Sequence, residues 1–264
     1  MPTLIIAGID SDLARPVIDF GLEQGLRIVG TTRNSSLTLT RPGIDAVYFC
    51  DFSSENSINI CVDEIVKAEK DSKLICIFSI GTLEPIGKFG EVDFNNWLNG
   101  IRINGLGPLC FIHNLLSKRK SDRDFFLTYS GNGTNSSPTH FSSYTLAKIM
   151  LIKSMEILAA EYPYKTFISL GTGWMKSKIH FPTLNSDSVP SEILDETKRR
   201  LEFDNFGNPD LIKEFISVVI NFNPEIASGR NFSLQNDPWQ EKVFWEKLVK
   251  SEDFHKLRRR SFSA

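Results

Sequence analysis

The sequence predicts an α/β fold: a doubly wound, parallel, seven-stranded sheet with helices on both faces. Three observations lead to this prediction. Apolar runs of strand length alternate with amphipathic segments of helix length along most of the chain. Several of these runs are apolar throughout, as in strands that are buried on both faces of a parallel sheet. No linker, low-complexity block or repeat divides the 264 residues, so we expect one domain over residues 1–264.

The expected strands follow from these apolar runs, and the first of them ends in Gly8. The opening strand–helix–strand unit is of the kind that is right-handed in almost all proteins. The fourth run is rich in β-branched and aromatic residues, which favour strands. The seventh run is the weakest of the set. The strands are expected at residues 3–8, 26–32, 46–51, 74–79, 124–129, 165–170 and 229–234.

The expected helices lie between these strands, where apolar residues recur at helical spacing. Asp93 is a suitable cap for one long helix, and Ser142 or Ser143 for another. A segment without clear periodicity, about 174–203, predicts a flap with one or two short helices. The tail, about 238–264, is strongly charged and predicts a helix. The other helices are expected at residues 13–25, 54–70, 93–116, 142–161 and 209–221.

Composition argues against several classes of function. The formal net charge is −2, with one short basic run at 258–260, so we expect no nucleic-acid partner. The four cysteines form no Cys-x-x-Cys pair and the four histidines no His-x-x-x-His pair, so we expect no metal site. We expect neither a signal peptide nor a membrane span. These features together favour the reducing cytoplasm.

The pair Tyr144 and Lys148 is the main candidate for chemistry. Four residues apart on a helix, the two side chains lie on one face, one turn apart. A phenol beside a fixed ammonium can have a depressed pKa, because the positive charge favours the phenolate. Such a pair suits general acid/base chemistry between an alcohol and a carbonyl. Taken alone, Tyr-x-x-x-Lys is also a common surface pair.

The position of Tyr144 and Lys148 in the chain favours a role in a ligand site. Ligands of doubly wound sheets bind at the carboxyl ends of the strands. Polar residues and glycines follow the expected strands there: Gly8, Thr32 and Arg33, Asp51, residues 79–81, Ser130 and residues 171–177. The pair follows the fifth strand and belongs to the same cluster.

With these motifs in this order, residues 3–235 resemble the compact, single-domain branch of the short-chain dehydrogenase/reductase family, as a divergent member. The resemblance implies a Rossmann-type dinucleotide-binding domain. The family's glycine-rich turn corresponds here to residues 7–14, where Gly8 is kept, Asp12 replaces the second glycine and Ala14 the third. The resemblance places Ser11, Asp12 and Leu13 in the cofactor turn.

Further cofactor contacts are also implied by the resemblance. No acid follows the second strand; Thr32 and Arg33 stand there, and a guanidinium suits a 2′-phosphate. NADP(H) is therefore favoured over NAD(H). Asp51 and Phe52 resemble the adenine-edge pair, and Ser79 and Gly81 the motif after strand four. After strand six, Gly173, Met175 and Ser177 correspond to the motif that approaches the nicotinamide, although its proline is replaced.

The resemblance also assigns the catalytic roles. Tyr144 exchanges a proton with the substrate oxygen, Lys148 lowers the pKa of the tyrosine and holds the nicotinamide ribose, Ser130 orients the substrate oxygen, and Asn104 completes a water-mediated proton path. The implied activity is hydride transfer between NADP(H) and a ketone or secondary alcohol. The substrate is a small molecule covered by the flap. Family members form homodimers or homotetramers through their long helices.

Three other functions are open. A nucleotide-sugar-modifying enzyme of the same superfamily uses the same tyrosine and lysine, but it normally has a longer C-terminal domain. A non-catalytic NAD(P)-binding regulator fits the altered glycine turn, although it has no physical need for all four catalytic residues. A serine hydrolase is disfavoured because Ser130 lacks the Gly-x-Ser-x-Gly turn.

Overall fold

The structure is a computed structural model that describes residues 1–34, 42–121, 123–130, 136–186, 188–204 and 206–259. Its centre is one parallel seven-stranded sheet with the order β3-β2-β1-β4-β5-β6-β7. The predicted fold class is therefore confirmed. The strands are β1 (Thr3–Ala7), β2 (Arg27–Thr32), β3 (Ala46–Phe49), β4 (Leu74–Phe78), β5 (Phe125–Ser130), β6 (Thr166–Gly171) and β7 (Arg230–Ser233).

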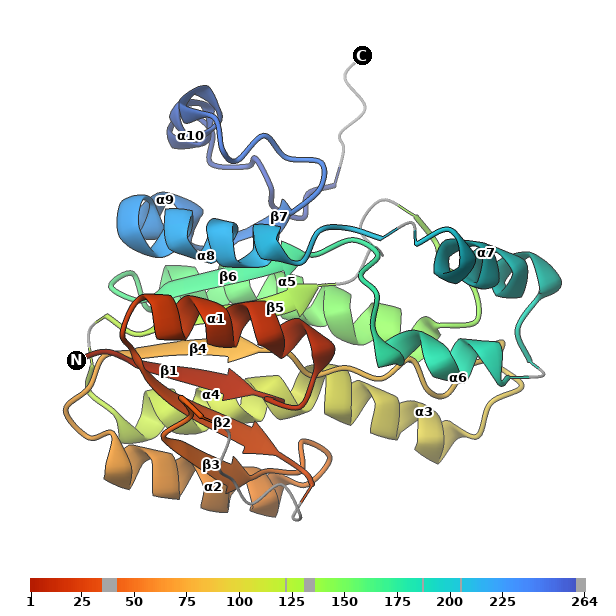
Figure 1. Ribbon diagram of the computed structural model, residues 1–264, viewed down its shortest axis with the longest axis horizontal. Coiled ribbons are helices and arrows are strands. Elements are labelled where there is room, and N and C mark those ends of the chain that lie inside the picture. Colours follow the sequence, from red (N-terminus) through yellow and green to blue (C-terminus); the bar gives the residue numbers. More distant parts are fainter. Residues whose placement is uncertain (35–41, 122, 131–135, 187, 205, 260–264) are drawn as a thin grey trace.

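Helices cover both faces of the sheet (Figure 1). One apolar core lies between the sheet and α1 (Arg15–Glu23) and α8 (Asp210–Phe222), and α10 (Lys242–Val249) adds aromatic side chains to it. A second core lies under α2 (Glu55–Ala68), α4 (Gly107–Lys118) and α5 (Ser142–Glu161). Burial on both faces explains why the central strands are apolar throughout.

The helix expected over residues 93–116 is interrupted. It consists of α3 (Phe94–Ile101), a π-helical segment at Arg102–Leu106 and α4. Asp93 caps α3 as expected, because its side chain accepts a hydrogen bond from the Asn96 backbone N–H. The expected serine caps of α5 are wrong: Phe141 is the N-cap residue and supplies no side-chain bond.

The remaining elements lie at the ends of the sheet. The flap contains a short 3-10 helix (Lys178–His180), α6 (Phe181–Leu184) and α7 (Ser191–Glu202), which agrees with the expectation of short helices there. Another 3-10 turn, Asp12–Ala14, precedes α1, and α9 (Pro224–Ala227) precedes β7. The tail is helical only in α10; beyond it the described chain continues without regular structure, so the expected tail helix is much shorter than the charged segment.

The strand arrowheads point toward the end of the molecule where α6 and α7 lie (Figure 1). This is the end at which a doubly wound sheet binds its ligands. No helix in the described part of the chain is long and apolar enough to cross a membrane.

Candidate active site

Tyr144 and Lys148 lie in the first turns of α5, at the carboxyl end of the sheet. The Lys148 Nζ is 5.6 Å from the centroid of the Tyr144 ring. Lys148 is 4% exposed, and its Nζ donates to the Ile80 carbonyl oxygen at 3.2 Å, directly after β4. Helix α5 thus brings Lys148 into contact with the loop after β4, residues 79–81, which the sequence also predicted to lie at the ligand-binding end of the sheet.

Burial changes the acid strength of both groups. It raises the pKa of Tyr144 to about 12 and lowers the pKa of Lys148 to about 8. Each shift disfavours the charged form, as expected of groups removed from water. The expected depression of the tyrosine pKa is therefore not found in the chain alone: the shift is upward, and burial is its cause.

Asn104 lies in the π-helical segment and is fully buried. Its Oδ1 accepts a hydrogen bond from the Thr82 N–H, and its Nδ2 donates to the carbonyl oxygens of Thr82 and Gly100, each at 2.9 Å. A buried amide with these partners is well satisfied. Asn104 therefore holds the loop that follows β4.

Gly81 is the point where these groups meet. A methyl group built on Gly81 would lie 3.5 Å from Asn104 Oδ1, 3.9 Å from Tyr144 Cε2 and 3.3 Å from the flap residue Ile179. The absent side chain leaves the tyrosine ring, the asparagine and the flap around one small space. The sequence identified Asn104, Gly81 and Tyr144 as site residues, and the structure brings all three together.

Ser130 ends β5 and is buried. Its Oγ donates to Asn231 Oδ1 on β7 at 2.8 Å, across β6. The strand between them presents Gly171 at this level, paired with Ser130, so no side chain blocks the contact. Sequence reasoning missed Asn231. The sequence offered one indication of it: Asn231 is a polar residue within the seventh expected strand, whose apolar pattern it interrupts.

The glycine-rich turn at residues 7–14, the candidate phosphate-binding turn and called the phosphate turn below, follows β1. Gly8 has a φ of +81°, which favours glycine, and its N–H donates to the Thr31 carbonyl oxygen. A Cβ on Gly8 would lie 3.3 Å from backbone and side-chain atoms of the Ser79–Ile80 loop. Ser79 Oγ donates to Ser11 Oγ at 2.9 Å. The turn therefore has the tight backbone and hydroxyl groups that suit a bound phosphate.

A cleft of about 130 Å³ opens beside this turn. It collects most of the expected cofactor residues from the first half of the chain and one lysine from the flap. Asp51 Oδ1 is already bonded to the Ser53 hydroxyl at 2.7 Å. The cleft is lined by Gly8, Asp10, Ser11, Thr31, Thr32, Arg33, Cys50, Asp51, Phe52, Ser79, Ile80, Gly81, Thr82, Ile103 and Lys178.

Apart from the catalytic pair on α5, five of the expected cofactor residues do not line this cleft. Leu13 packs against the core under α1, and the Met175 side chain is 3% exposed in the same core. Gly173 has a φ of +75° and lies against Gln235. Asp12 Oδ2 accepts a hydrogen bond from the Lys178 N–H at 2.7 Å, so its carboxylate is engaged by the flap. Ser177 is the N-cap of the flap's 3-10 helix.

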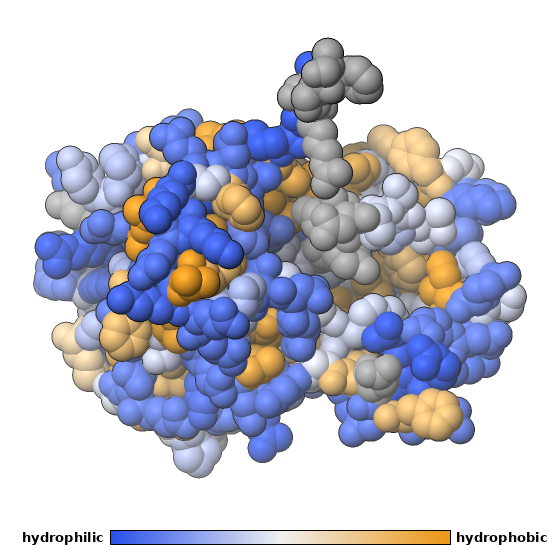
Figure 2. Space-filling view, turned by 90° about the horizontal axis from the view of Figure 1, so that it is seen from above, coloured by the Kyte–Doolittle hydropathy of each residue, from blue (hydrophilic) through white to orange (hydrophobic). Residues whose placement is uncertain are grey.

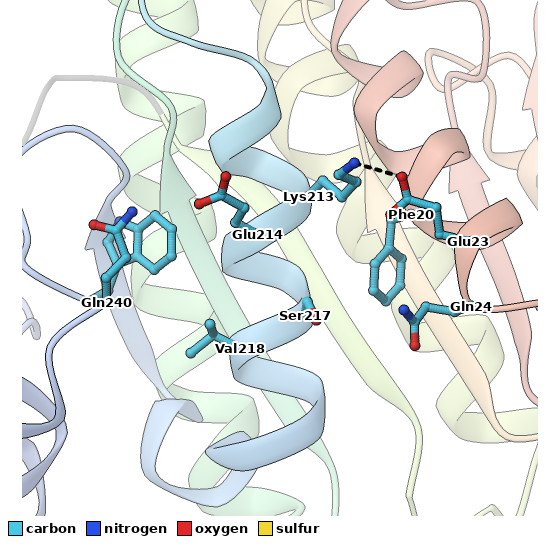
Figure 3. Close-up of a pocket in the computed structure, with 9 residues that line it drawn as sticks. Phe20, Glu23, Gln24, Lys213, Glu214, Ser217, Val218 and Gln240 are labelled. Carbon is cyan, nitrogen blue, oxygen red and sulfur yellow. Dashed lines mark hydrogen bonds and ion pairs between the residues drawn. The ribbon is translucent and has the colours of Figure 1, made fainter.

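A larger cavity of about 410 Å³ lies elsewhere, between α1 and α8. Figure 3 shows the ion pair between Lys213 and Glu23 spanning it, with an N–O distance of 2.7 Å. None of the candidate catalytic or cofactor residues lines it. Its position on the helical layer, away from the strand ends, argues against it as the active site despite its size.

Three further findings bear on the type of site. Among the residues described, no group of three or more histidine, cysteine or acidic side chains is placed to hold a metal ion. Cys50, Cys61 and Cys76 are buried free thiols, and Cys110 is a half-buried one. On the face seen in Figure 2, hydrophobic residues are scattered among hydrophilic ones.

Known structures share this fold. The chain is similar to a short-chain dehydrogenase/reductase from Saccharomyces cerevisiae, with 17% identity and a TM-score of 0.79 over 90% of this chain and 97% of that one. It is also similar to a variant of actinorhodin polyketide ketoreductase with NADPH, with 15% identity and a TM-score of 0.73 over 88% of this chain and 95% of that one. NAD⁺-bound xylitol dehydrogenase is similar as well, with 14% identity and a TM-score of 0.73 over 88% of this chain and 96% of that one. No family model and no curated protein sequence matches. The chain therefore has the fold of the short-chain dehydrogenases/reductases.

Proposed function

We propose that this protein is an NADP(H)-dependent oxidoreductase of the short-chain dehydrogenase/reductase type, which interconverts a ketone and a secondary alcohol. One observation carries the proposal. Asn104, Tyr144 and the flap converge on Gly81, beside a cleft lined by the phosphate turn and Arg33. The fold, which it shares with ketoreductases and dehydrogenases, supports the same class of reaction.

A nicotinamide dinucleotide fits the residues present. Gly8 gives the backbone the close approach that a pyrophosphate needs, and Ser11 and Ser79 offer hydroxyl groups. Asp51 and Phe52 would hold the adenine side and Lys148 the ribose on the nicotinamide side. When bound, the cofactor supplies the hydride.

The chain's own residues manage the proton and the charge on the substrate oxygen. Tyr144 is protonated at neutral pH, since its pKa is about 12, and so it is a proton donor in the reducing direction. In the other direction it must lose its proton, which a bound substrate and the Lys148 ammonium would assist. Ser130 would orient the substrate oxygen, and Asn104 would keep the loop after β4 in place for a proton path.

The preference for NADP(H) rests on Arg33. It lines the cleft directly after β2, where a guanidinium can bind a 2′-phosphate with two hydrogen bonds. No acidic residue takes the corresponding place at Thr32 or Asn34. The substrate is a small carbonyl or alcohol compound that the flap, about residues 174–203, covers.

Two further features belong to this proposal. A homodimer or homotetramer formed through the long helices is supported by apolar side chains exposed on them: Leu106, Leu146 and Ile157 are each about half exposed. The four free thiols support a reducing compartment, the cytoplasm.

The test is a titration of the purified protein with NADPH and NADH, followed by assays of ketone reduction. We expect NADPH to bind more tightly than NADH and Arg33→Ala to remove most of that difference. Oxidation of NADPH in the presence of a ketone from a broad panel would establish the enzyme class. Absence of binding to both dinucleotides would refute the proposal.

A second candidate, a non-catalytic dinucleotide-binding regulator, is favoured by one observation. Ser130 donates its hydroxyl proton to Asn231, so in this arrangement it has no proton to donate to a substrate oxygen. Tight NADPH binding without turnover of any ketone or alcohol in the panel, nucleotide sugars included, would favour this candidate.

A further inference from the structure

The phosphate turn and the flap are tied together by Asp12 and Lys178, which lie 166 residues apart in the sequence. The Lys178 backbone N–H donates to Asp12 Oδ2 at 2.7 Å. The Lys178 Nζ donates to the Asp10 carbonyl oxygen at 2.6 Å. One flap residue therefore contacts the turn with both its backbone and its side chain.

The Asp12 carboxylate is directed at the flap. A carboxylate beside a pyrophosphate would be repulsive, and glycine is usual at this place in the turn because it lets the backbone approach the phosphates closely. Asp12 instead satisfies the N–H of Lys178 and does not line the cleft, whereas Asp10, Ser11 and Lys178 do. Asp12, which replaces the glycine that would let the backbone approach the phosphates, is thus the residue that anchors the flap.

The Lys178 ammonium brings positive charge to the cleft. Its acceptor is a neutral carbonyl oxygen, which leaves the charge of the ammonium available to an anion. It lines the same cleft as Arg33 and Ser11, so two cationic side chains, one from the loop after β2 and one from the flap, border the phosphate turn. Asp10 and Asp51 are the acidic residues of that lining, and without the two cations they would disfavour a phosphate.

The flap residues on both sides of Lys178 are held by further contacts. The Trp174 ring is stacked on His180, with centroids 4.7 Å apart, and the Arg200 guanidinium lies 4.6 Å from the Trp174 ring. The Trp174 carbonyl oxygen accepts the Gly207 N–H at 2.7 Å. His180 Nε2 is 2.9 Å from the Met175 carbonyl oxygen. These contacts order the segment that presents Lys178 to the turn.

We propose that Lys178 binds the pyrophosphate of the dinucleotide, and that Asp12 holds the flap residue in place for this role. The inference rests on the proposed dinucleotide site. In this arrangement the Lys178 ammonium supplies a contact to the phosphates in addition to those of the turn, where Asp12 replaces the usual glycine.

The test compares Lys178→Gln with Lys176→Gln. Lys176 belongs to the same flap and is a matched control, since it is exposed and pairs with Asp204 at 2.7 Å. Dissociation constants are measured by calorimetric titration with NADPH, NADH and adenosine 2′-monophosphate, which lacks the pyrophosphate. We expect Lys178→Gln to weaken both dinucleotides by about 10-fold or more, as for the loss of one charge-assisted hydrogen bond, and to leave adenosine 2′-monophosphate unchanged. Lys176→Gln should change none of the three.

A second variant tests the anchor. Asp12→Ala should weaken NADPH binding and speed cleavage of residues 174–204 by an added protease, because the flap loses its bond to the turn. Equal NADPH affinity of the Lys178 and Lys176 variants, or an equal loss for adenosine 2′-monophosphate, would overturn the role of Lys178. If the wild-type protein binds neither dinucleotide, the proposed function itself is wrong and this inference is wrong with it.

Discussion

At the scale of single residues, the candidate chemistry depends on Tyr144 and on the groups that hold Lys148 and Ser130. The Lys148 Nζ lies 5.6 Å from the centroid of the Tyr144 ring. Burial raises the pKa of the Tyr144 phenol to about 12, so the phenol is protonated at neutral pH. The protein without its cofactor is therefore poised as a proton donor. Positive charge or hydrogen-bond donors at the phenolic oxygen would be needed to lower this pKa.

Replacement of Tyr144 by Phe removes the phenolic proton and little else. We expect turnover to fall by about 10²-fold or more, the scale of general acid/base catalysis, with NADPH affinity nearly unchanged. Steady-state assays and NADPH titration of the same preparation measure both effects. Tyr129→Phe is the control, since this buried tyrosine bonds only weakly to the Leu13 carbonyl oxygen, at 3.4 Å. Equal turnover of the wild type and Tyr144→Phe would contradict the assigned role.

Asn231 sets the direction of the Ser130 hydroxyl. Asn231→Leu removes the acceptor at similar size, and we expect a lower kcat for ketone reduction with a KM for NADPH close to that of the wild type. Asn231→Asp keeps an acceptor oxygen and should retain more activity. The exposed Asn221→Leu on α8 is the control. Equal kcat values for Asn231→Leu and the wild type would show that the bond has no part in the reaction.

At the scale of elements, helix α5 combines the proposed catalytic role of Tyr144 and Lys148 with a structural role. It carries Lys148 into a buried position, where the only acceptor that the described residues give it is the Ile80 carbonyl oxygen. Burial of an ammonium costs stability, and the lowered pKa measures that cost. A helix that served stability alone would have an apolar residue at this position.

Lys148→Met should therefore stabilise the fold while it removes activity. The folded-state pKa of about 8 lies below the ordinary 10.5, so protonation opposes folding below pH 8, and this penalty decreases as the pH rises from 8 toward 10.5. At 1.36 kcal/mol per unit the gain at pH 7 is about 3 kcal/mol. Denaturant unfolding at pH 7 and at pH 10 measures it. The exposed Lys153→Met on the same helix should change the free energy of unfolding by less than about 1 kcal/mol.

The π-helical segment is the second element that the site requires. It places the Asn104 amide so that it accepts a hydrogen bond from the Thr82 N–H and donates one to the Thr82 carbonyl oxygen. Asn104→Leu would leave the half-buried Thr82 N–H without its acceptor, and we expect a loss of about 2 kcal/mol in the free energy of unfolding together with weaker NADPH binding. Asn114→Leu on α4, where the amide bonds only within its own helix, is the matched control.

At the scale of the whole molecule, the C-terminal segment supports the site from the far edge of the sheet. The Asn231 N–H donates to the His255 carbonyl oxygen at 2.8 Å, so the tail pairs with the outer edge of β7. Arg230, 8% exposed, donates to four carbonyl oxygens, those of Ile226, Leu248, Ser251 and Phe254. The strand that holds Ser130 through Asn231 is thus fixed by the tail.

Arg230→Met should loosen this connection. Loss of a buried guanidinium leaves several carbonyl oxygens without a donor, so we expect a destabilisation of about 3 kcal/mol or more in denaturant unfolding. Arg258→Met, in the same tail but with a guanidinium that is itself exposed and paired with Glu156 and Asp253, should cost much less. Similar losses for the two variants would contradict the structural role of Arg230.

The sequence was sufficient for the sheet because most strands are apolar runs, and the predicted strand ends agree with the structure to within one or two residues. It also predicted Asn104, Gly81 and Tyr144 as site residues, and these three lie close together in the structure. It was not sufficient where long-range contacts decide the outcome. The direction of the Asp12 carboxylate depends on Lys178, and that of the Ser130 hydroxyl depends on Asn231. The break at residues 102–106 was not predicted either, and the Ser142 hydroxyl accepts a hydrogen bond from Trp97 Nε1, far away in the sequence, in place of capping α5.

The most direct test of the central claim is the absorbance change of NADPH when the wild-type protein is mixed with a panel of ketones, run in parallel with Tyr144→Phe. We predict oxidation of NADPH by the wild type with at least one ketone, and a rate about 10²-fold lower for the variant despite similar NADPH binding. Tight NADPH binding with no oxidation by the wild type, or equal rates for the two proteins, would contradict the account.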